Sequence, residues 1–156
     1  MPSYVTSRLV FIAWIASIPG LTASGTGNQL PPDETTWSQG GYVVVPATVG
    51  GTPEGNMPLR KPVGQVECWA TIPGSDKLPW NLAAGLCEEI YRATLDRQNF
   101  GRLLTITDDG VPYPSARASS AKVLTEPHQI WSDVGDYAGW QFDLLLQWTQ
   151  IGEVIP

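Results

Sequence analysis

The most regular pattern of hydrophobic and polar positions lies near the C-terminal end, in the segment AGWQFDLLLQWTQI at 138–151. Every second residue from Trp140 to Trp148 is apolar, and the residues between them are polar except Leu145. This alternation predicts an antiparallel strand with one buried face. The segment VGQVECWATI at 63–72 has the same period and predicts a second such strand. Its apolar face carries four residues: Val66, Cys68, Ala70, Ile72.

A helical period follows in WNLAAGLCEEIYRATL at 80–95, where apolar residues recur at every fourth position: Leu82, Leu86, Ile90. Pro79 suits the first turn of this helix, and Gly101 is expected to end it. The N-terminal segment 1–18 predicts another helix, over Tyr4–Ile18, which is apolar on nearly all sides. Such a helix is expected to be covered on most of its surface.

Weaker signals predict further strands. Tyr42–Thr48 is expected to form an edge or bulged strand, because Pro46 has no backbone N–H to donate. Leu103–Thr107 predicts a strand that ends at an Asp109-Gly110 turn. A last pattern, Ala118–Thr125, is expected to continue through His128–Trp131 beyond Pro127.

Two segments predict long loops, at 49–64 and 108–121, because both are rich in residues that interrupt regular structure. A loop of that length in a compact domain is usually functional or mobile. The order of helices and strands lacks a regular β-α-β alternation. It predicts one α+β domain over residues 1–156, with an antiparallel sheet of about four to five strands and two main helices on one face.

Composition changes the picture in one respect. The 156 residues carry a net charge of -6, seven tryptophans and only 15% charged residues. The only adjacent basic pair is Arg60-Lys61, so direct binding of nucleic acid is not expected. Sparse charge and many tryptophans favour a subunit of an assembly, although a compact monomer with a Trp-rich core fits them equally well.

No pattern in the sequence predicts catalysis, a cofactor or a metal site. His128 is the only histidine, and the adjacent carboxylates Glu88-Glu89 and Asp108-Asp109 are expected to point apart. Cys68 and Cys87 match neither a disulfide framework nor a zinc pattern, and we expect two free, buried thiols. Three tryptophans outside the predicted core faces are candidate anchors for a partner protein: Trp37, Trp69, Trp131.

Several segments, taken in order and spacing, resemble the tail terminator and neck proteins of long-tailed (siphovirus-type) bacteriophages. They are WIASIPGL (14–21), LPPDETTW (30–37), GGYVVVPATVGG (40–51), PVGQVECWA (62–70), WNLAAGLCEEIYRAT (80–94) and AGWQFDLLLQWT (138–149). The resemblance runs through most of the chain. Each motif alone is unspecific.

The resemblance implies a structural virion protein without catalytic residues, assembled in the host cytoplasm. It implies a homo-oligomeric ring, usually a hexamer, that caps the tail tube, stops its growth and joins the head-closure or connector protein. DNA would pass through the lumen without specific binding, and no membrane is involved. The contacts with neighbouring subunits and the tube would then involve Trp37, Tyr42, Arg60, Lys61 and Trp131.

Three alternatives remain open at this point. Another neck or head-closure connector protein has a similar composition. A secreted binding domain would use its first residues as a signal peptide, because Arg8, an apolar run and small residues at 22–25 resemble one. Removing residues 1–24 separates this alternative from a core helix. A small enzyme with a dispersed site is the third alternative, and the lone histidine argues against it.

Overall fold

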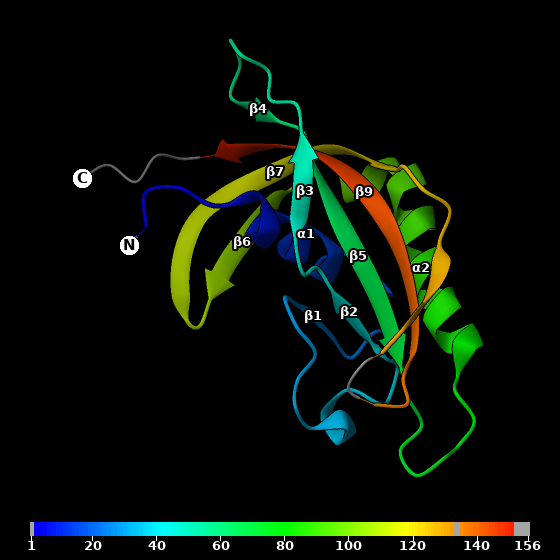
Figure 1. Ribbon diagram of the computed structural model, residues 1–156. Helices are drawn as coiled ribbons and strands as arrows, with labels where there is room; N and C mark the ends of the chain where they lie inside the picture. Colours follow the sequence, from blue (N-terminus) through cyan, green and yellow to red (C-terminus); the bar gives the residue numbers. More distant parts are fainter. Residues whose placement is uncertain (1, 133–134, 152–156) are drawn as a thin grey trace.

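The computed structural model describes residues 2–132 and 135–151, and nine strands of these residues form one mixed, curled sheet (Figure 1). The strand order is β1-β2-β5-β9-β7-β6, with β3 beside β5, and β4 and β8 beside β9. The strands are β1 (Gly25–Gly27), β2 (Tyr42–Val44), β3 (Thr48–Gly51), β4 (Leu59–Arg60), β5 (Pro62–Ala70), β6 (Leu103–Asp108), β7 (Val111–Val123), β8 (His128–Trp131) and β9 (Ala138–Ile151).

The chain is broadly α+β, but the expected antiparallel sheet of four to five strands is wrong. The described residues form nine strands, and β1 pairs with β2 in parallel. The extra strands are short or lie in segments rich in glycine and proline. Strands this short are paired mainly through backbone hydrogen bonds, so they leave little alternating pattern in the sequence.

The two strands with the clearest alternation lie side by side in the middle of the sheet. β5 and β9 pair in register from Val63 with Leu145 to Ala70 with Ala138. The predicted apolar faces are buried: Val66, Cys68, Ala70 on β5, and Phe142, Leu144, Leu146, Trp148 on β9. Ile72 and Trp140 are exceptions: β5 ends at Ala70 and half of the Ile72 side chain is exposed, and Trp140 is only partly buried.

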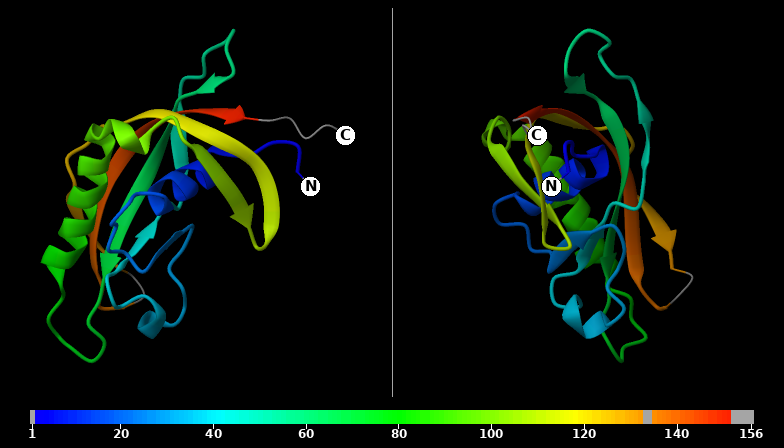
Figure 2. Two further views of the ribbon diagram at one scale, coloured as in Figure 1. Left: turned by 180° about the vertical axis from the view of Figure 1, so that it is seen from behind. Right: turned by 90° about the vertical axis from the view of Figure 1, so that its left-hand side faces the viewer.

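Two helices contribute to the same core, and the sheet curls around the first of them (Figure 2). The first, α1 (Ser7–Ala16), is shorter than the expected Tyr4–Ile18. Its fully buried residues are Val10, Phe11, Trp14 and Ile15. The indole N–H of Trp148 donates to Ser7 Oγ at 3.1 Å and ties α1 to β9. In the described residues, neither helix has the length and apolar character needed to cross a membrane.

The second helix, α2 (Trp80–Leu95), packs against β5, β7 and β9. Its buried side is Ala83, Leu86, Cys87, Ile90 and Ala93. Leu82, which the four-residue period placed in this stripe, is exposed. A 3-10 turn over Arg97–Asn99 then leads to β6.

Both predicted long loops contain strands. The segment 49–64 holds most of β3, all of β4 and the beginning of β5, and its tip projects from the body of the sheet (Figure 1). The segment 108–121 is the turn and most of the long strand β7. Asp109 and Gly110 form the predicted turn, with positive φ angles of 49° and 76°.

The predicted strand Ala118–Thr125 corresponds to the second half of β7, and prolines explain why its first half was missed. Pro112 pairs with Thr107 of β6, but Pro114 falls where the register between β6 and β7 shifts. Pairing of β7 with β9 begins only at Ser115. The missing N–H of Pro114 therefore lies in a bulge and removes no hydrogen bond from the ladder.

Candidate functional site

The outer face of the sheet, opposite the helices, carries a second apolar cluster. Its buried members are Trp37, Val44 and Trp69, and four partly buried side chains pack against them: Leu30, Tyr42, Ile130, Tyr137. The indole of Trp37 meets the ring of Tyr137 edge to face, with centroids 5.1 Å apart. This cluster positions the side chains of a groove on the outer face.

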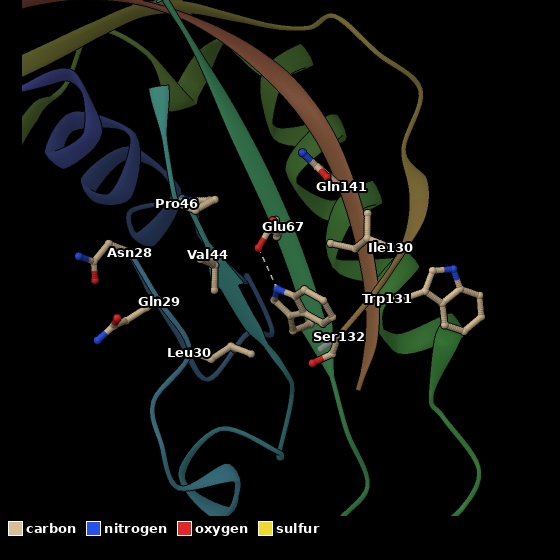
Figure 3. A pocket seen from close by; sticks show the side chains of 11 residues that line it. Asn28, Gln29, Leu30, Val44, Pro46, Glu67, Ile130, Trp131, Ser132 and Gln141 are labelled. Atoms are coloured by element: carbon tan, nitrogen blue, oxygen red, sulfur yellow. Dashed lines mark hydrogen bonds between the residues drawn. The ribbon is translucent and has the colours of Figure 1, made fainter. Parts of the chain in front are cut away.

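The groove has a volume of about 620 Å³ and lies over β2, β5 and β9. That volume is in the range of roughly 300–1,000 Å³ in which ligand sites fall. Residues of the segment after β1 form one wall, and β8 forms the other (Figure 3). Its lining residues are Asn28, Gln29, Leu30, Val44, Pro46, Glu67, Trp69, Ile130, Trp131, Ser132 and Gln141.

Strand register explains the arrangement of the groove floor. Val44 of β2 pairs with Glu67 of β5, and Glu67 pairs with Gln141 of β9. These three residues therefore form one row across the sheet on its outer face. In the next row, Trp69 lies beside Gly139, and Ile130 of β8 lies on the other side of that glycine.

Among the described residues, Glu67 is the only charged one that lines the groove. The indole N–H of Trp69 donates to Glu67 Oε1 at 3.2 Å and holds the carboxylate over the floor (Figure 3). No cationic side chain within ion-pair distance of Glu67 is found among the described residues, whose one salt bridge joins Lys61 to Glu54. The nearby Arg8 instead donates to the Pro46 carbonyl oxygen at 2.9 Å and lines a different cavity, between α1, β1 and the β6–β7 turn.

The five residues expected at an interface fall into two separate regions. Trp37 and Tyr42 belong to the outer-face cluster, and Trp131 lies at the nearby groove. Arg60 and Lys61 lie close to the projecting tip of segment 49–64. The structure therefore does not bring all five together.

Two of these five residues, Trp37 and Tyr42, pack against other parts of the chain itself. Trp37 is 1% exposed, because its indole is packed within the outer-face cluster. The Tyr42 ring covers β1, since a side chain at either Gly25 or Gly27 would collide with it. Burial raises the pKa of the Tyr42 phenol above its ordinary value.

The remaining three are accessible. Trp131 is 72% exposed and meets Trp80 edge to face, with ring centroids 5.0 Å apart. Arg60 is exposed on one side, and its guanidinium carbon lies 5.5 Å from the centre of the Trp148 ring. Lys61 forms an ion pair with Glu54 at the base of the projecting tip.

The His, Cys, Asp and Glu side chains of the described residues do not gather into a metal site. No cluster of three or more His, Cys, Asp or Glu side chains there could hold a metal ion. Cys68 and Cys87 are free and buried. Burial, with a hydrogen bond between the two thiols as a smaller contribution, raises the pKa of Cys68 well above 9.0. His128 is exposed on β8.

Five strands in the described part of the chain pair with one other strand only: β1, β3, β4, β6 and β8. Two of them, β3 and β6, lie on opposite sides of the central β5–β9 pair and carry exposed apolar side chains. β3 pairs only with β5, and β6 pairs only with β7. All four residues of β3 are exposed, and Val49 within it has half of its side chain in solvent. Leu103 at the start of β6 is exposed to a similar extent. Exposed apolar side chains on open strand edges favour pairing with another chain.

Sequence reasoning found only part of the groove. Alternation placed Glu67 and Trp69 together on the outward face of their strand, and both do line it. The wall residues Asn28, Gln29 and Leu30 were missed, because they lie in a segment with no periodic pattern. Only the parallel pairing of β1 with β2 brings this segment to the outer face.

Comparison with known proteins assigns the chain to no family. No protein-family model matches this sequence, and no curated protein matches it. The function is therefore inferred from the residues and the fold of the chain itself.

Proposed function

We propose that this protein is a structural subunit of a phage tail or neck that assembles into a ring. In the form that the sequence resemblance favours, the ring is a hexamer that caps the tail tube and stops its polymerisation. It then presents the surface for the head-closure or connector protein. DNA passes through the lumen, and the subunit has no catalytic role.

The observation that carries this proposal is that two open strand edges with exposed apolar side chains, β3 and β6, lie on opposite sides of one sheet. A ring requires two different surfaces on each subunit, because its contacts run head to tail. β3 and β6 are two such surfaces, with Val49 on the first and Leu103 on the second. A strand edge also supplies affinity through backbone hydrogen bonds, whatever its side chains.

The packing of α1 supports the proposal against the secreted-domain alternative. Phe11 and Trp14 are fully buried, and Trp14 Nε1 donates to the Asn99 carbonyl oxygen at 2.9 Å. A signal peptide is removed from the mature protein, whereas these contacts make α1 part of the core. A different neck component would use the same strand edges to form a ring. Only binding to the tail tube distinguishes a terminator from such a component.

Light scattering across protein and salt concentration tests the proposal. A chain of 16.9 kDa should give a discrete ring-sized species, either alone or when tail tubes of the encoding phage are added. Val49→Glu and Leu103→Glu should each reduce this species, because a charge on an edge strand opposes pairing. Leu95→Glu is the matched control, since Leu95 is an exposed leucine of helix α2 and belongs to no strand.

Two results would contradict the proposal. One is a chain that stays monomeric at high concentration and ignores added tubes. The other is a ring that Leu95→Glu weakens as much as the two edge variants do. A ring that forms but does not bind tubes would instead favour a neck component other than the terminator.

A further inference from the structure

We infer that Cys68 and Cys87 form an oxidation site, at which hydrogen peroxide joins the two thiols in a disulfide that fastens helix α2 to strand β5. The inference does not rest on the proposed function, and the failure of either leaves the other untouched. It rests on a contact between two buried thiols, on the path of α2 over β5, and on the small side chains beside this contact.

The two thiols meet inside the core. Cys68 on β5 and Cys87 on α2 are both fully buried and belong to one hydrophobic cluster. Their side chains form a hydrogen bond with each other, so the two sulfur atoms are neighbours. A disulfide requires Cβ atoms about 3.5–4.5 Å apart and side chains that point toward each other. Thiols on the facing sides of a helix and a strand have this orientation.

The path of α2 over β5 places the two cysteines at the same level. Ala83 of α2 packs into a small buried cluster with Ala70 of β5 and its neighbour on β9, Ala138. Cys87 follows one turn further along the helix, a step of about 6 Å. Cys68 lies two residues back along the strand, a step of about 6.6 Å. Since the two steps are nearly equal, contact at the alanines predicts contact at the cysteines.

Small residues let α2 approach the sheet closely at this level. The contact beside the cysteines consists of three alanines. Gly41, just before β2, lies against the same helix, because a Cβ there would be 2.8 Å from Leu86 Cδ1. The distance between two packed elements depends on the side chains at their contact. Close approach is what a disulfide needs, because its two Cα atoms lie only about 4.4–6.8 Å apart.

Hydrogen peroxide accepts the two electrons that the disulfide releases. The thiolate of one cysteine attacks a peroxide oxygen, the O–O bond breaks, and a sulfenic acid and hydroxide form. The second sulfur then attacks the sulfenic sulfur, so that the S–S bond forms and the S–O bond breaks. The two thiol protons leave with the two oxygens, and one peroxide becomes two waters. The chain has no other cysteine that could compete.

Burial makes this reaction slow and restricts it to small oxidants. It raises the pKa of Cys68 well above 9.0, so little thiolate is present in the folded chain. The folded protein should therefore resist alkylation by N-ethylmaleimide, which is bulkier than peroxide. Once formed, the disulfide closes a loop that contains the connection between β5 and α2, and such a loop restricts the unfolded chain.

Counting thiols before and after peroxide treatment tests the inference. The folded protein is treated with peroxide, the peroxide is removed with catalase, and the chain is then denatured and alkylated with N-ethylmaleimide. The untreated chain should take up two labels and the treated chain none, and dithiothreitol should restore both. Mass spectrometry of an unreduced digest should find the Cys68 and Cys87 peptides joined. The cysteine peptides are analysed by themselves, because the exposed Met57 also gains oxygen from peroxide.

The linked protein should keep the native near-ultraviolet circular dichroism spectrum. Its Tm should rise by roughly 5–10 °C, because the unfolded chain is restricted. Cys68→Ala and Cys87→Ala are the matched variants, since each leaves one buried thiol without its partner. After the same treatment, neither should give linked peptides or a higher Tm.

Three results would overturn the inference. Thiols that stay free in the folded protein, but are oxidised in urea, would show that the native pair does not bond. Sulfinic acid at both cysteines would show that the sulfur atoms do not approach each other. A disulfide between two chains, or a linked chain with a lower Tm and a lost near-ultraviolet spectrum, would show that the bond forms only after α2 leaves the sheet.

Discussion

The indole ring of Trp69 lies over the backbone of Gly139, in the space that a side chain at Gly139 would fill. A Cβ atom placed there would lie 2.7 Å from Trp69 Cε3 and 2.8 Å from Ile130 Cγ1. Residue 139 is the direct neighbour of Trp69 in the β5–β9 pairing. Glycine at this one position therefore allows the floor and the β8 wall of the groove to close over β9.

Gly139→Ala should destabilise the fold by about 1–3 kcal/mol, because the added methyl group overpacks the contact between Trp69 and Ile130. Urea unfolding followed by circular dichroism would measure the change. The same variant should displace the Trp69 indole resonance in the NMR spectrum. An unfolding midpoint equal to that of the wild type would contradict this packing.

Gly85→Ala should have the opposite effect. Gly85 is exposed in the middle of α2, its φ angle is not positive, and a Cβ there would meet no atom within 4 Å. Alanine should therefore stabilise the protein by about 0.5–1 kcal/mol, since it loses less backbone freedom on folding. The same urea titration gives the sign, and a lower midpoint would show that Gly85 makes a contact in solution that the fold does not explain.

The central part of the fold could be predicted from the sequence, because burial of one strand face leaves a period of two. Phe142, Leu144 and Leu146 were assigned to the core on that basis and are fully buried. Helix α2 was also predicted, although its buried stripe is rotated so that Leu82 is exposed. In both cases the core itself imposes the pattern.

The periphery could not be predicted, because backbone hydrogen bonds impose no side-chain pattern. β1 consists of Gly25, Thr26 and Gly27, and its place is fixed by bonds such as that from Val45 N to the Gly27 carbonyl oxygen at 2.9 Å. The groove wall formed by Asn28, Gln29 and Leu30 follows directly after β1. Two segments that are distant in the sequence form this groove, so predicting it would have required the order of the strands in the sheet. No local sequence pattern contains that order.

The N-terminal helix gives a test that separates a core element from a leader. Phe11 is fully buried, and its ring lies so close to Gly64 that a Cβ at residue 64 would be 2.9 Å from it. Phe11→Ala should cost about 3–5 kcal/mol of stability, because it leaves a cavity between α1 and β5.

Removal of residues 1–24 should abolish cooperative unfolding altogether, since it deletes every buried residue of α1. Thermal unfolding by calorimetry would measure both variants. Gly20→Ala is unsuitable as a control, because the φ angle of Gly20 is +75°. Arg8→Gln is suitable, since it changes an exposed hydrogen bond to Pro46. If the chain without residues 1–24 keeps the thermal unfolding transition of the full chain, the alternative that these residues are a signal peptide is correct.

The buried Cys68 thiol makes stability depend on pH in the alkaline range. Burial, and to a smaller extent the adjacent Cys87 thiol, raises the pKa of Cys68 well above the ordinary value of 9.0. The unfolded chain therefore releases this proton at a lower pH than the folded chain. The resulting stabilisation is fully present below about pH 8 and is lost as the pH rises past 9 toward the folded pKa.

Urea titrations of the wild type and Cys68→Ala between pH 7 and 10 would measure this loss. The stability advantage of the wild type over the variant should be constant up to about pH 8 and should then decrease, because only the wild type has a thiolate to form at residue 68 on unfolding. Tyr42 and Tyr137, whose phenol pKa values burial also raises, are present in both proteins and cancel in the difference. A difference that stays constant to pH 10 would mean that Cys68 ionises equally readily in the folded chain.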